Sequence, residues 1–302
     1  MKTKLILLFA TSFTAMLSYC QQDSQFTQYM YNTINVNPAY SGSRDVLSVF
    51  VMQRTQWVGL DGAPVTNVIS INSPLNGTNW GLGVSLVSDK LGPTSENIIS
   101  TDLSYTIQTS DNWKLSFGIK ATANVFNLDA SKLNPLTSTA NFQSYQTLTP
   151  NFGSGLYYYS EKAYIGFSIP NFIETDRYND NEVAVFKEKI NYYLIGGLVF
   201  DLAEKIKFKP AFLTKIVQGA PLQIHVSGNF LFFDKLTLGA SYRWSAAVSA
   251  MAGFQVSDGF YIGYGYDQET TNLANFNQGS HELFIRYELF KTNSKITTPR
   301  FF

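Results

Sequence analysis

The sequence predicts an all-β protein, a transmembrane up-and-down antiparallel β-barrel of the outer-membrane type with about fourteen strands. Three observations predict this fold class. Apolar and polar residues alternate with a period of two over most of the chain after Asp45. No stretch beyond the first twenty residues is apolar for long enough to cross a membrane as a helix. The longest links between alternating stretches all follow odd-numbered strands, which is typical of barrels with short turns at one rim.

The composition excludes several classes of protein. The 302 residues include 22 basic and 22 acidic residues, so the chain lacks the basic excess of a nucleic-acid-binding protein. Charged residues make up 15% of the chain, below the roughly 25% of soluble domains. Aromatic residues make up another 15%, which excludes a disordered chain. The single cysteine, Cys20, excludes a disulfide scaffold.

The first twenty residues are typical of a secretory signal peptide. Lys2 and Lys4 precede a short apolar stretch, and Ser18 and Cys20 occupy the −3 and −1 positions of a cleavage site. We expect cleavage after Cys20, which leaves a mature chain without cysteine. The alternative is a lipoprotein signal with Cys20 acylated, although Tyr19 is larger than the residue that normally precedes a lipidated cysteine. An exported chain without a helical span is either soluble or a barrel in the outer membrane, and we expect the barrel.

Strands are predicted wherever apolar residues occupy every second position. In the clearest stretch, from Trp113 to Val125, every odd position is apolar and every even position is polar or glycine. Such a run exceeds the roughly 5–6 residues of a typical soluble strand and suits a tilted strand across a bilayer. The alternation predicts strands over residues 45–57, 64–72, 79–88, 96–107, 112–125, 149–159, 162–170, 189–200, 205–216, 221–232, 235–245, 247–256, 259–267 and 280–290.

The links between these strands differ in length according to parity. Links after even-numbered strands are short, whereas the three longest, residues 126–150, 170–189 and 268–279, follow odd-numbered strands. Short periplasmic turns and longer extracellular loops are typical of outer-membrane barrels. An even strand count returns both ends of the barrel to the periplasmic side. A soluble secreted β-sandwich is disfavoured because its connections have no reason to sort in this way.

The polar rows are predicted to line a lumen that fourteen strands make too wide for their own side chains to fill. We therefore expect the lumen to be occupied or to conduct. Candidate occupants are residues 21–44, the link 126–150 and a partner polypeptide.

Charged and histidine residues on the strands are interpreted as wall residues. His225 and His281 are both assigned to outward rows. Glu282, Arg286 and Glu288 alternate on one face and predict a ladder of ion pairs, although Phe284 interrupts this polar row. The motifs of serine hydrolases, phosphate-binding loops and zinc helices are missing from the sequence. We therefore expect no enzymatic activity, no cofactor and no metal.

The segment after the signal peptide carries a specific pattern. It reads Gln-Phe-Thr-Gln-Tyr-Met-Tyr-Asn over residues 25–32 and Asn-Pro-Ala-Tyr-Ser-Gly over residues 37–42. This pattern closely resembles the start of the PorP/SprF family, outer-membrane proteins of the type IX secretion system. The resemblance continues over residues 56–64, 165–171, 192–201, 208–234, 239–243 and 281–287. It implies an outer-membrane barrel that helps to export or anchor cargo proteins, including a large gliding adhesin.

The expected organisation has four parts. Residues 1–20 are the signal peptide, residues 21–44 an N-terminal periplasmic or plug segment, residues 45–290 the barrel and residues 291–302 a C-terminal tail. The tail differs from the expected early stop after the last strand, and it is either a disordered end or a periplasmic handle for a partner.

Plug or partner-binding residues are expected in the opening pattern and in the long links. Amide side chains offer uncharged donors and acceptors, proline fixes a turn, and tyrosines are large anchors with a polar tip. The candidates are Gln28, Tyr29, Met30, Tyr31, Asn32, Asn37, Pro38, Tyr40, Phe142, Tyr145 and Tyr178.

Composition and alternation leave two functions open. The first is a partner-binding barrel that handles a cell-surface cargo, and the second is an outer-membrane pore or transporter for small or hydrophobic solutes. Both functions need the same wall, so composition does not separate them. The resemblance favours the first, with a secreted cargo protein or secretion components as partners, outer-membrane lipid around the wall, and no nucleic acid.

Overall fold

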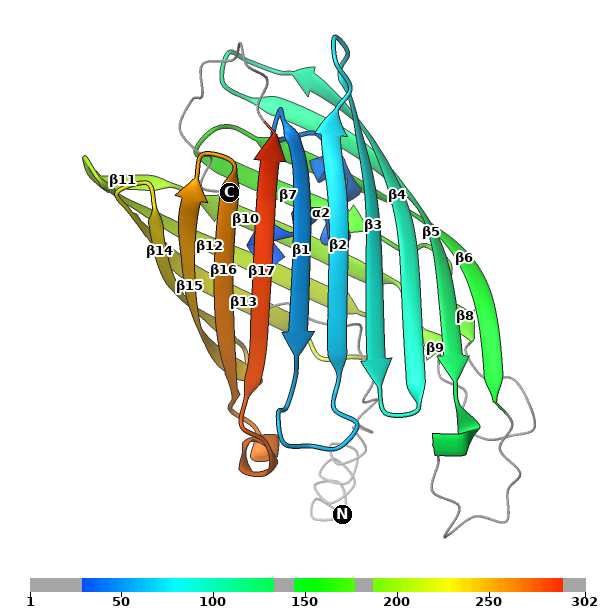
Figure 1. The fold of residues 1–302 in the computed structure, drawn as a ribbon. Helices are drawn as coiled ribbons and strands as arrows, with labels where there is room; N and C mark the ends of the chain where they lie inside the picture. The colour runs from blue at the N-terminus through cyan, green and yellow to red at the C-terminus, as the bar shows by residue number, and fades with distance from the viewer. Residues whose placement is uncertain (1–28, 133–143, 177–186, 290–302) are drawn as a thin grey trace, which may run out of the picture.

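The structure is a computed structural model that describes residues 29–132, 144–176 and 187–289. In this part of the chain fifteen strands form one antiparallel sheet, and pairing between β10 and β12 closes the sheet into a barrel (Figure 1). β10 and β11 are two parts of one wall strand, interrupted at Val199, so the described wall has fourteen strands. The predicted up-and-down barrel of about fourteen strands is confirmed.

The strands follow one another around the wall in chain order. Its first half consists of β1 (Leu47–Thr55), β2 (Val65–Pro74), β3 (Trp80–Leu91), β4 (Thr94–Gln108), β5 (Lys114–Leu128), β6 (Tyr145–Tyr159) and β7 (Ala163–Ile169). Its second half consists of β10 (Asn191–Leu198) with β11 (Phe200–Ala203), β12 (Ile206–Val217), β13 (Gln223–Phe232), β14 (Leu236–Arg243), β15 (Ala247–Ser257), β16 (Phe260–Glu269) and β17 (Ser280–Leu289). β8 (Thr175–Asp176) and β9 (Lys187–Glu188) form a separate pair.

The two rims of the barrel carry different links. We call the rim with links 75–79, 109–113, 160–162, 204–205, 233–235 and 258–259 the short-turn rim. The opposite rim, which we call the long-link rim, carries the links after β5, β7 and β16, with the short helices η3 (Ala130–Lys132) and η5 (Asn272–Phe276). β1 begins and β17 ends at the short-turn rim, at the top of Figure 1.

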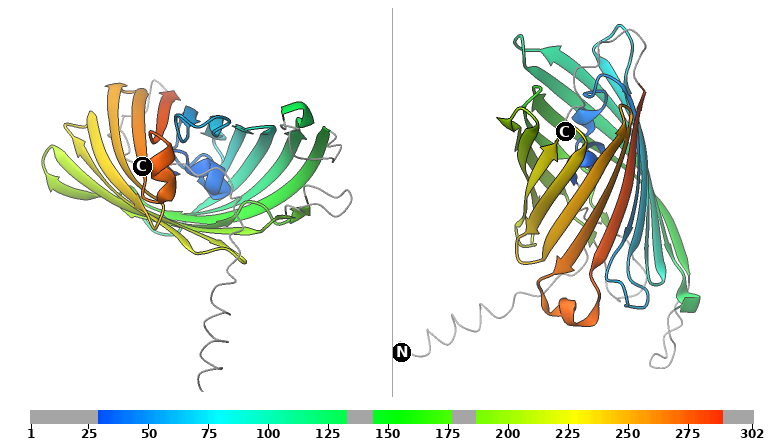
Figure 2. Two further views of the ribbon diagram at one scale, coloured as in Figure 1. Left: turned by 90° about the horizontal axis from the view of Figure 1, so that it is seen from below. Right: turned by 60° about the vertical axis from the view of Figure 1, so that its left-hand side comes forward.

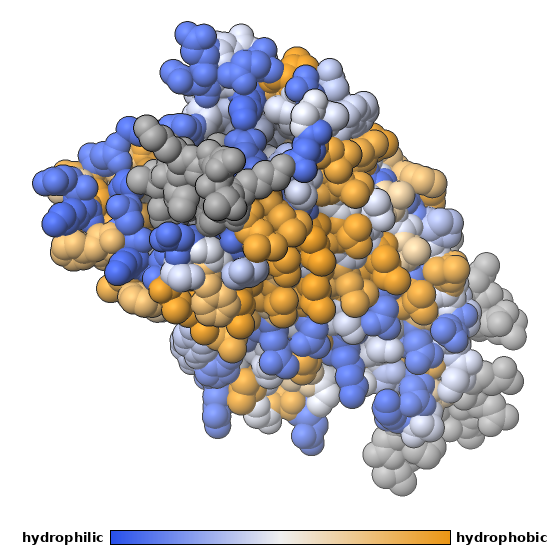
Figure 3. Space-filling model, turned by 45° about the horizontal axis from the view of Figure 1, so that its top comes forward, coloured by the Kyte–Doolittle hydropathy of each residue, from blue (hydrophilic) through white to orange (hydrophobic). Residues whose placement is uncertain are grey.

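The wall is apolar outside and polar inside, as the alternation predicts. On β5 the outward side chains Phe117 and Ile119 are 46% and 61% exposed, whereas the inward Ser116 and Lys120 are buried. The same pattern repeats around the wall and produces an apolar band between polar zones (Figure 3). Such a band matches the hydrocarbon core of a bilayer, because apolar surface of this extent is rarely left in water.

The structure corrects the orientation of one histidine. His225 on β13 points inward and is buried, so its assignment to an outward row was wrong. The alternation in β13 places Val226 and Phe230 outside, which leaves His225 in the same row as Ser227 and Asn229. His281 on β17 lies on the outer face, where its ring nitrogen is 2.6 Å from the hydroxyl oxygen of Tyr264.

The strands that flank the longest link also extend beyond their predicted bounds. β5 and β6 pair without interruption from Lys114 with Tyr159 to Leu128 with Tyr145. β6 therefore begins at Tyr145, four residues before the predicted start. The extension reaches the long-link rim, where hydrogen bonding between the two strands continues past the apolar alternation that the prediction followed.

Candidate functional site

The lumen of the barrel contains residues 29–44, which we call the lumen segment (Figure 2). It consists of three short helical turns, η1 (Tyr29–Tyr31), α2 (Thr33–Val36) and η2 (Pro38–Tyr40), joined by Asn32 and Asn37. Every residue of these three turns is buried except Asn35, which is partly buried. Wide barrels need an occupant or a channel, and here the chain's own N-terminal segment lies in the lumen.

Asn37 and Pro38 explain the local shape of the segment. Asn37 has extended backbone angles and ends α2, and its side-chain oxygen accepts a hydrogen bond from the amide of Ala39 at 3.0 Å. This is an N-cap interaction, which replaces a hydrogen bond that the first turn of a helix lacks. Pro38 follows at the first position of η2, where a missing amide hydrogen costs nothing.

Five inward-facing glycines of the wall form the surface on which the lumen segment rests. A Cβ atom built at any of them would lie under 3.0 Å from an atom of the segment, a distance that real Cβ atoms essentially never show. The segment atoms belong to Ile34, Asn37, Pro38, Ala39 and Ser41. We call this surface the glycine face; it consists of Gly81, Gly83, Gly118, Gly155 and Gly166. The fit is steric, so any side chain at these positions would push the segment away.

Polar side chains of the wall satisfy the backbone of the segment. The hydroxyl of Ser104 donates to the carbonyl of Ser41 at 2.6 Å, and that of Ser168 donates to the carbonyl of Val36 at 2.8 Å. The side-chain nitrogen of Asn37 in turn donates to the wall carbonyl of Leu156 at 2.9 Å. Buried backbone groups need such partners, so the polar inner wall binds an irregular segment that could not lie in an apolar core.

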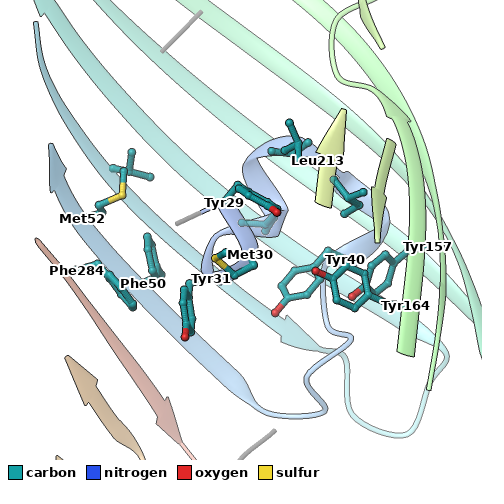
Figure 4. Packing of buried hydrophobic residues seen from close by; sticks show 14 of the residues in the cluster. Tyr29, Met30, Tyr31, Tyr40, Phe50, Met52, Tyr157, Tyr164, Leu213 and Phe284 are labelled. Atoms are coloured by element: carbon teal, nitrogen blue, oxygen red, sulfur yellow. The ribbon is translucent and has the colours of Figure 1, made fainter. Parts of the chain in front are cut away.

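Aromatic rings fix the segment at two places (Figure 4). The Tyr31 ring packs against Tyr261 and Phe284, with ring centroids 5.6 and 5.0 Å apart. The Tyr40 ring packs edge-on against Tyr157 at 5.6 Å. Phe284 is the residue that interrupts the polar row of β17. Its inward ring has a structural reason, because it packs between Tyr31 of the segment and Phe50 of the wall.

Tyr29 ends the described lumen segment near the long-link side. Its ring stands edge-on to the His225 ring, with centroids 5.9 Å apart, and its hydroxyl lies 3.4 Å from that of Ser227. His225 points inward and packs against Tyr29 of the lumen segment.

Buried ion pairs cross between strands and reach the segment. Arg44 pairs with Glu288 at the short-turn rim and donates to the Tyr40 hydroxyl at 3.5 Å. Glu282 pairs with Arg54 on β1 at 3.2 Å, and Arg286 lies 3.5 Å from Glu288. The three charged residues of β17 therefore take part in ion pairs, with arginines of the segment and of β1 completing the ladder. Because these pairs are buried, removing one partner would leave the other charge buried without compensation and would destabilise the protein.

The predicted site residues divide into three groups. Tyr29, Met30, Tyr31, Asn32, Asn37, Pro38 and Tyr40 lie together in the lumen segment and are buried. Tyr145 begins β6 at the long-link rim, apart from that group. Gln28, Phe142 and Tyr178 lie outside the described residues.

The glycine face and the aromatic partners on the wall were not predicted from the sequence. The glycines alternate with apolar residues, as in Trp80-Gly81-Leu82-Gly83, and this pattern shows only that they point into the lumen. Their alignment across four strands depends on the register between neighbouring strands from β3 to β7.

A cavity of about 140 Å³ lies beside the lumen segment. Tyr29, Asn35 and Val36 of the segment line one side of it. The wall contributes charged, amide and apolar side chains, among them Asp89, Glu96, Lys120, Lys215, Gln223 and His225. Among the residues that the structure describes, no group of three or more histidine, cysteine or carboxylate residues is placed to hold a metal ion.

Comparison with known proteins decides the family. A family described as "Type IX secretion system membrane protein PorP/SprF" matches residues 18–287. The chain belongs to the PorP/SprF family. No curated protein matches the chain. This PorP/SprF protein contains, within the described ranges, no helix of the length and apolarity needed to cross a membrane.

Solved structures with a similar fold are outer-membrane barrels. The crystal structure of the Ralstonia pickettii toluene transporter TbuX is similar with a TM-score of 0.52 and 8% identity, covering 85% of this chain and 92% of that chain. The Acinetobacter baumannii outer membrane protein Omp33 has a TM-score of 0.50 and 6% identity, covering 82% of this chain and all of that one (100%). At these identities the likeness shows the fold alone. Family and fold together indicate the outer membrane as the location of this PorP/SprF protein.

Proposed function

We propose that this PorP/SprF barrel binds a secreted cargo protein and helps to export it or anchor it on the cell surface. The observation that carries the proposal is that residues 29–44 of the chain occupy the lumen. The lumen segment rests on the glycine face, and its ends are held by Tyr31 and by the Arg44–Glu288 pair. A barrel that works as a diffusion pore needs a continuous aqueous path. A barrel whose lumen is occupied by its own chain is better suited to binding partners at its rims than to conducting solutes.

The long-link rim offers the side chains for such binding. Phe172, Ile173 and Leu222 are 44%, 46% and 54% exposed, and Phe276 in η5 is 68% exposed. Exposed aromatic and aliphatic side chains in links are typical anchors of protein interfaces. Tyr145 begins β6 on the same rim. We propose that these residues contact cargo or secretion components, and that the barrel itself carries no catalytic activity.

The proposed topology follows from the export signal and the rims. The signal peptide is cleaved after Cys20, with acylation of Cys20 as the alternative, and the long-link rim faces the cell exterior. A cargo arriving at the surface would then meet the exposed side chains of that rim first.

Recovery of partners tests the proposal directly. The tagged barrel is isolated from detergent-solubilised outer membrane, and co-purifying proteins are identified by mass spectrometry. A large surface protein or secretion components are expected. A barrel that is recovered without partners and conducts ions in planar bilayers would contradict the proposal and favour a pore.

A further inference from the structure

β6 is much longer than its neighbour β7. Its fifteen residues all pair with β5 on one side. On the other side, β6 pairs with β7 only over residues 154–159, because β7 ends at Ile169. The half of β6 nearest the long-link rim therefore lies at an edge of the sheet, at the lower right of Figure 1.

The backbone groups that face this edge follow from the ladder. Successive residues of a strand point their N–H and C=O groups alternately to the two sides. The Phe152 carbonyl accepts a hydrogen bond from the Phe172 amide at 2.7 Å, so the even-numbered residues of β6 face the edge. Beyond Phe152, the groups that face it are the N–H and C=O of Gln146 and Leu148 and the C=O of Pro150. Within residues 29–132, 144–176 and 187–289, none of these five groups has a backbone partner.

This edge carries little protection against an added strand. Edge strands are usually protected by charged side chains, bulges or prolines. The edge of β11 at the short-turn rim has such protection, because Asp201 pairs with Lys162 there. Residues 145–150 of β6 read Tyr-Gln-Thr-Leu-Thr-Pro, without a charge and without a shift of register against β5. Pro150 is the one protective residue among these six, and it leaves Gln146 and Leu148 able to pair.

The open edge lies beyond the apolar band of the wall. Ile119 is the middle residue of the outward apolar row on β5, and it pairs with Ser154 of β6. Leu148 lies six residues further along β6, which is about 20 Å along the strand and about 15 Å along the membrane normal at a tilt of about 40°. Half of the apolar band is only about 12 Å. The edge therefore reaches water at the long-link rim, as it must, because open sheet edges are excluded from the hydrocarbon region.

We infer that residues 146–150 of β6 receive an extended segment of the secreted cargo protein as an added strand. This inference rests on the proposed function and names the contact that the cargo makes. The five edge groups supply donors and acceptors to the added backbone, which is the usual basis of recognition by strand addition. Leu148 is 65% exposed on the outer face, and Phe172, 44% exposed, is hydrogen-bonded to the same strand. The site thus fits an uncharged, β-forming segment with an apolar side chain on that face.

A second copy of the barrel does not fit this edge. Two barrels in one membrane share the direction of the membrane normal, and their strands are tilted from it by about 35–45°. A two-fold axis along the normal reverses the in-plane part of that tilt, so that two copies of β6 would cross at about 70–90°. Strands that pair in a sheet differ in direction by only about 20–25°. A segment outside the membrane is free to take the direction of β6.

Photo-cross-linking in intact cells tests the inference. A benzoyl-phenylalanine replaces Gln146 or Leu148 in the tagged full-length barrel, and the same replacement at Thr109, in an exposed short turn, is the control. After irradiation the barrel is purified and cross-linked peptides are mapped by mass spectrometry. Both edge positions are expected to reach one segment of a secreted protein, at sites about two residues apart, as paired strands require. The control position should not reach that segment.

Two variants at one position separate backbone pairing from side-chain contact. Leu148→Pro removes an N–H that faces away from β5, and it should lower cross-linking from position 146 about tenfold. Leu148→Ala keeps the N–H and should lower it less than about threefold. Leu148→Lys adds the charge that natural edges use and should act like the proline. Heat-modifiable migration shows which variants are folded.

The outcomes distinguish this inference from the proposed function. Cross-links to a second barrel would overturn the inference, and so would equal losses from Leu148→Pro and Leu148→Ala. Cross-links to no protein, while a secreted partner still co-purifies, would overturn it and leave the proposed function standing. Absence of any co-purifying partner would contradict both.

Discussion

The side chain of Asn37 lies directly on Gly155, so that a Cβ at Gly155 would come under 3.0 Å from the Asn37 oxygen. The same amide caps η2 through Ala39 and donates to Leu156 of the wall. One residue thus shapes the lumen segment and docks it on the barrel, which explains why Asn-Pro is followed by a helical turn at this point.

Gly155→Ala is expected to lower the free energy of unfolding by about 1–3 kcal/mol, because overpacking forces Asn37 away from its site. Gly228→Ala is the matched control: its Cβ would meet only the ring of Phe208, at 3.1 Å. Urea unfolding followed by heat-modifiable migration measures both. Equal stability of the two variants would contradict the steric role of the glycine face.

Arg44→Ala is expected to destabilise the barrel by about 3 kcal/mol, the lower end of the cost of breaking a buried ion pair from one side. Arg286 remains 3.5 Å from Glu288 and limits the loss. The triple variant Arg44→Met, Arg286→Met, Glu288→Leu should recover much of the stability, because it removes both guanidinium groups together with the carboxylate that they share. An unfolding series of the single and the triple variant checks this; a triple variant weaker than the single one would exclude the explanation.

Phe117→Lys is expected to cost about 2–4 kcal/mol near the bilayer midplane, and Leu238→Lys a similar amount. Both side chains belong to the outward rows and are 46% and 44% exposed. Thr109→Lys, in an exposed short turn, should cost only about 0–1 kcal/mol. Unfolding in lipid vesicles measures the difference. If both wall variants were as stable as the unmodified protein, the outward side chains of β5 and β14 would not face lipid.

Deletion of residues 25–42 is expected to open an ion-conducting path and to abolish cargo display, because it removes most of the lumen segment. The intact barrel should show little conductance in planar bilayers, and so should a chain lacking residues 291–302. Conductance of the intact barrel equal to that of the deletion variant would show that the segment does not close the lumen.

Phe276→Ser is expected to reduce cargo recovery several-fold, whereas Phe233→Ser should not. The two rings are similarly exposed, at 68% and 65%, but lie on opposite rims. Quantitative mass spectrometry of co-purified proteins compares the variants. Equal losses from both would indicate a general effect on the barrel and would argue against binding at the long-link rim.

The wall of this protein could be predicted from the sequence because alternation is a local property of a strand. Trp113 to Val125 already defines which side chains face lipid, and Phe117 and Ile119 do so in the structure. The opening pattern from Gln25 to Gly42 also indicated the family, because the pattern lies within one short stretch of the sequence.

Contacts across the lumen could not be predicted in this way. Whether Asn37 meets Gly155 depends on the register of the strands from β1 to β6, and whether Arg44 meets Glu288 depends on the pairing of β1 with β17, the first and last strands of the wall. His225 shows the consequence: a shift of one residue reverses the face of a strand residue, and only the paired wall decides its direction. The sequence by itself therefore determined the barrel and its outward face, whereas the tertiary structure decided what fills the lumen, because packing there joins residues far apart in the chain.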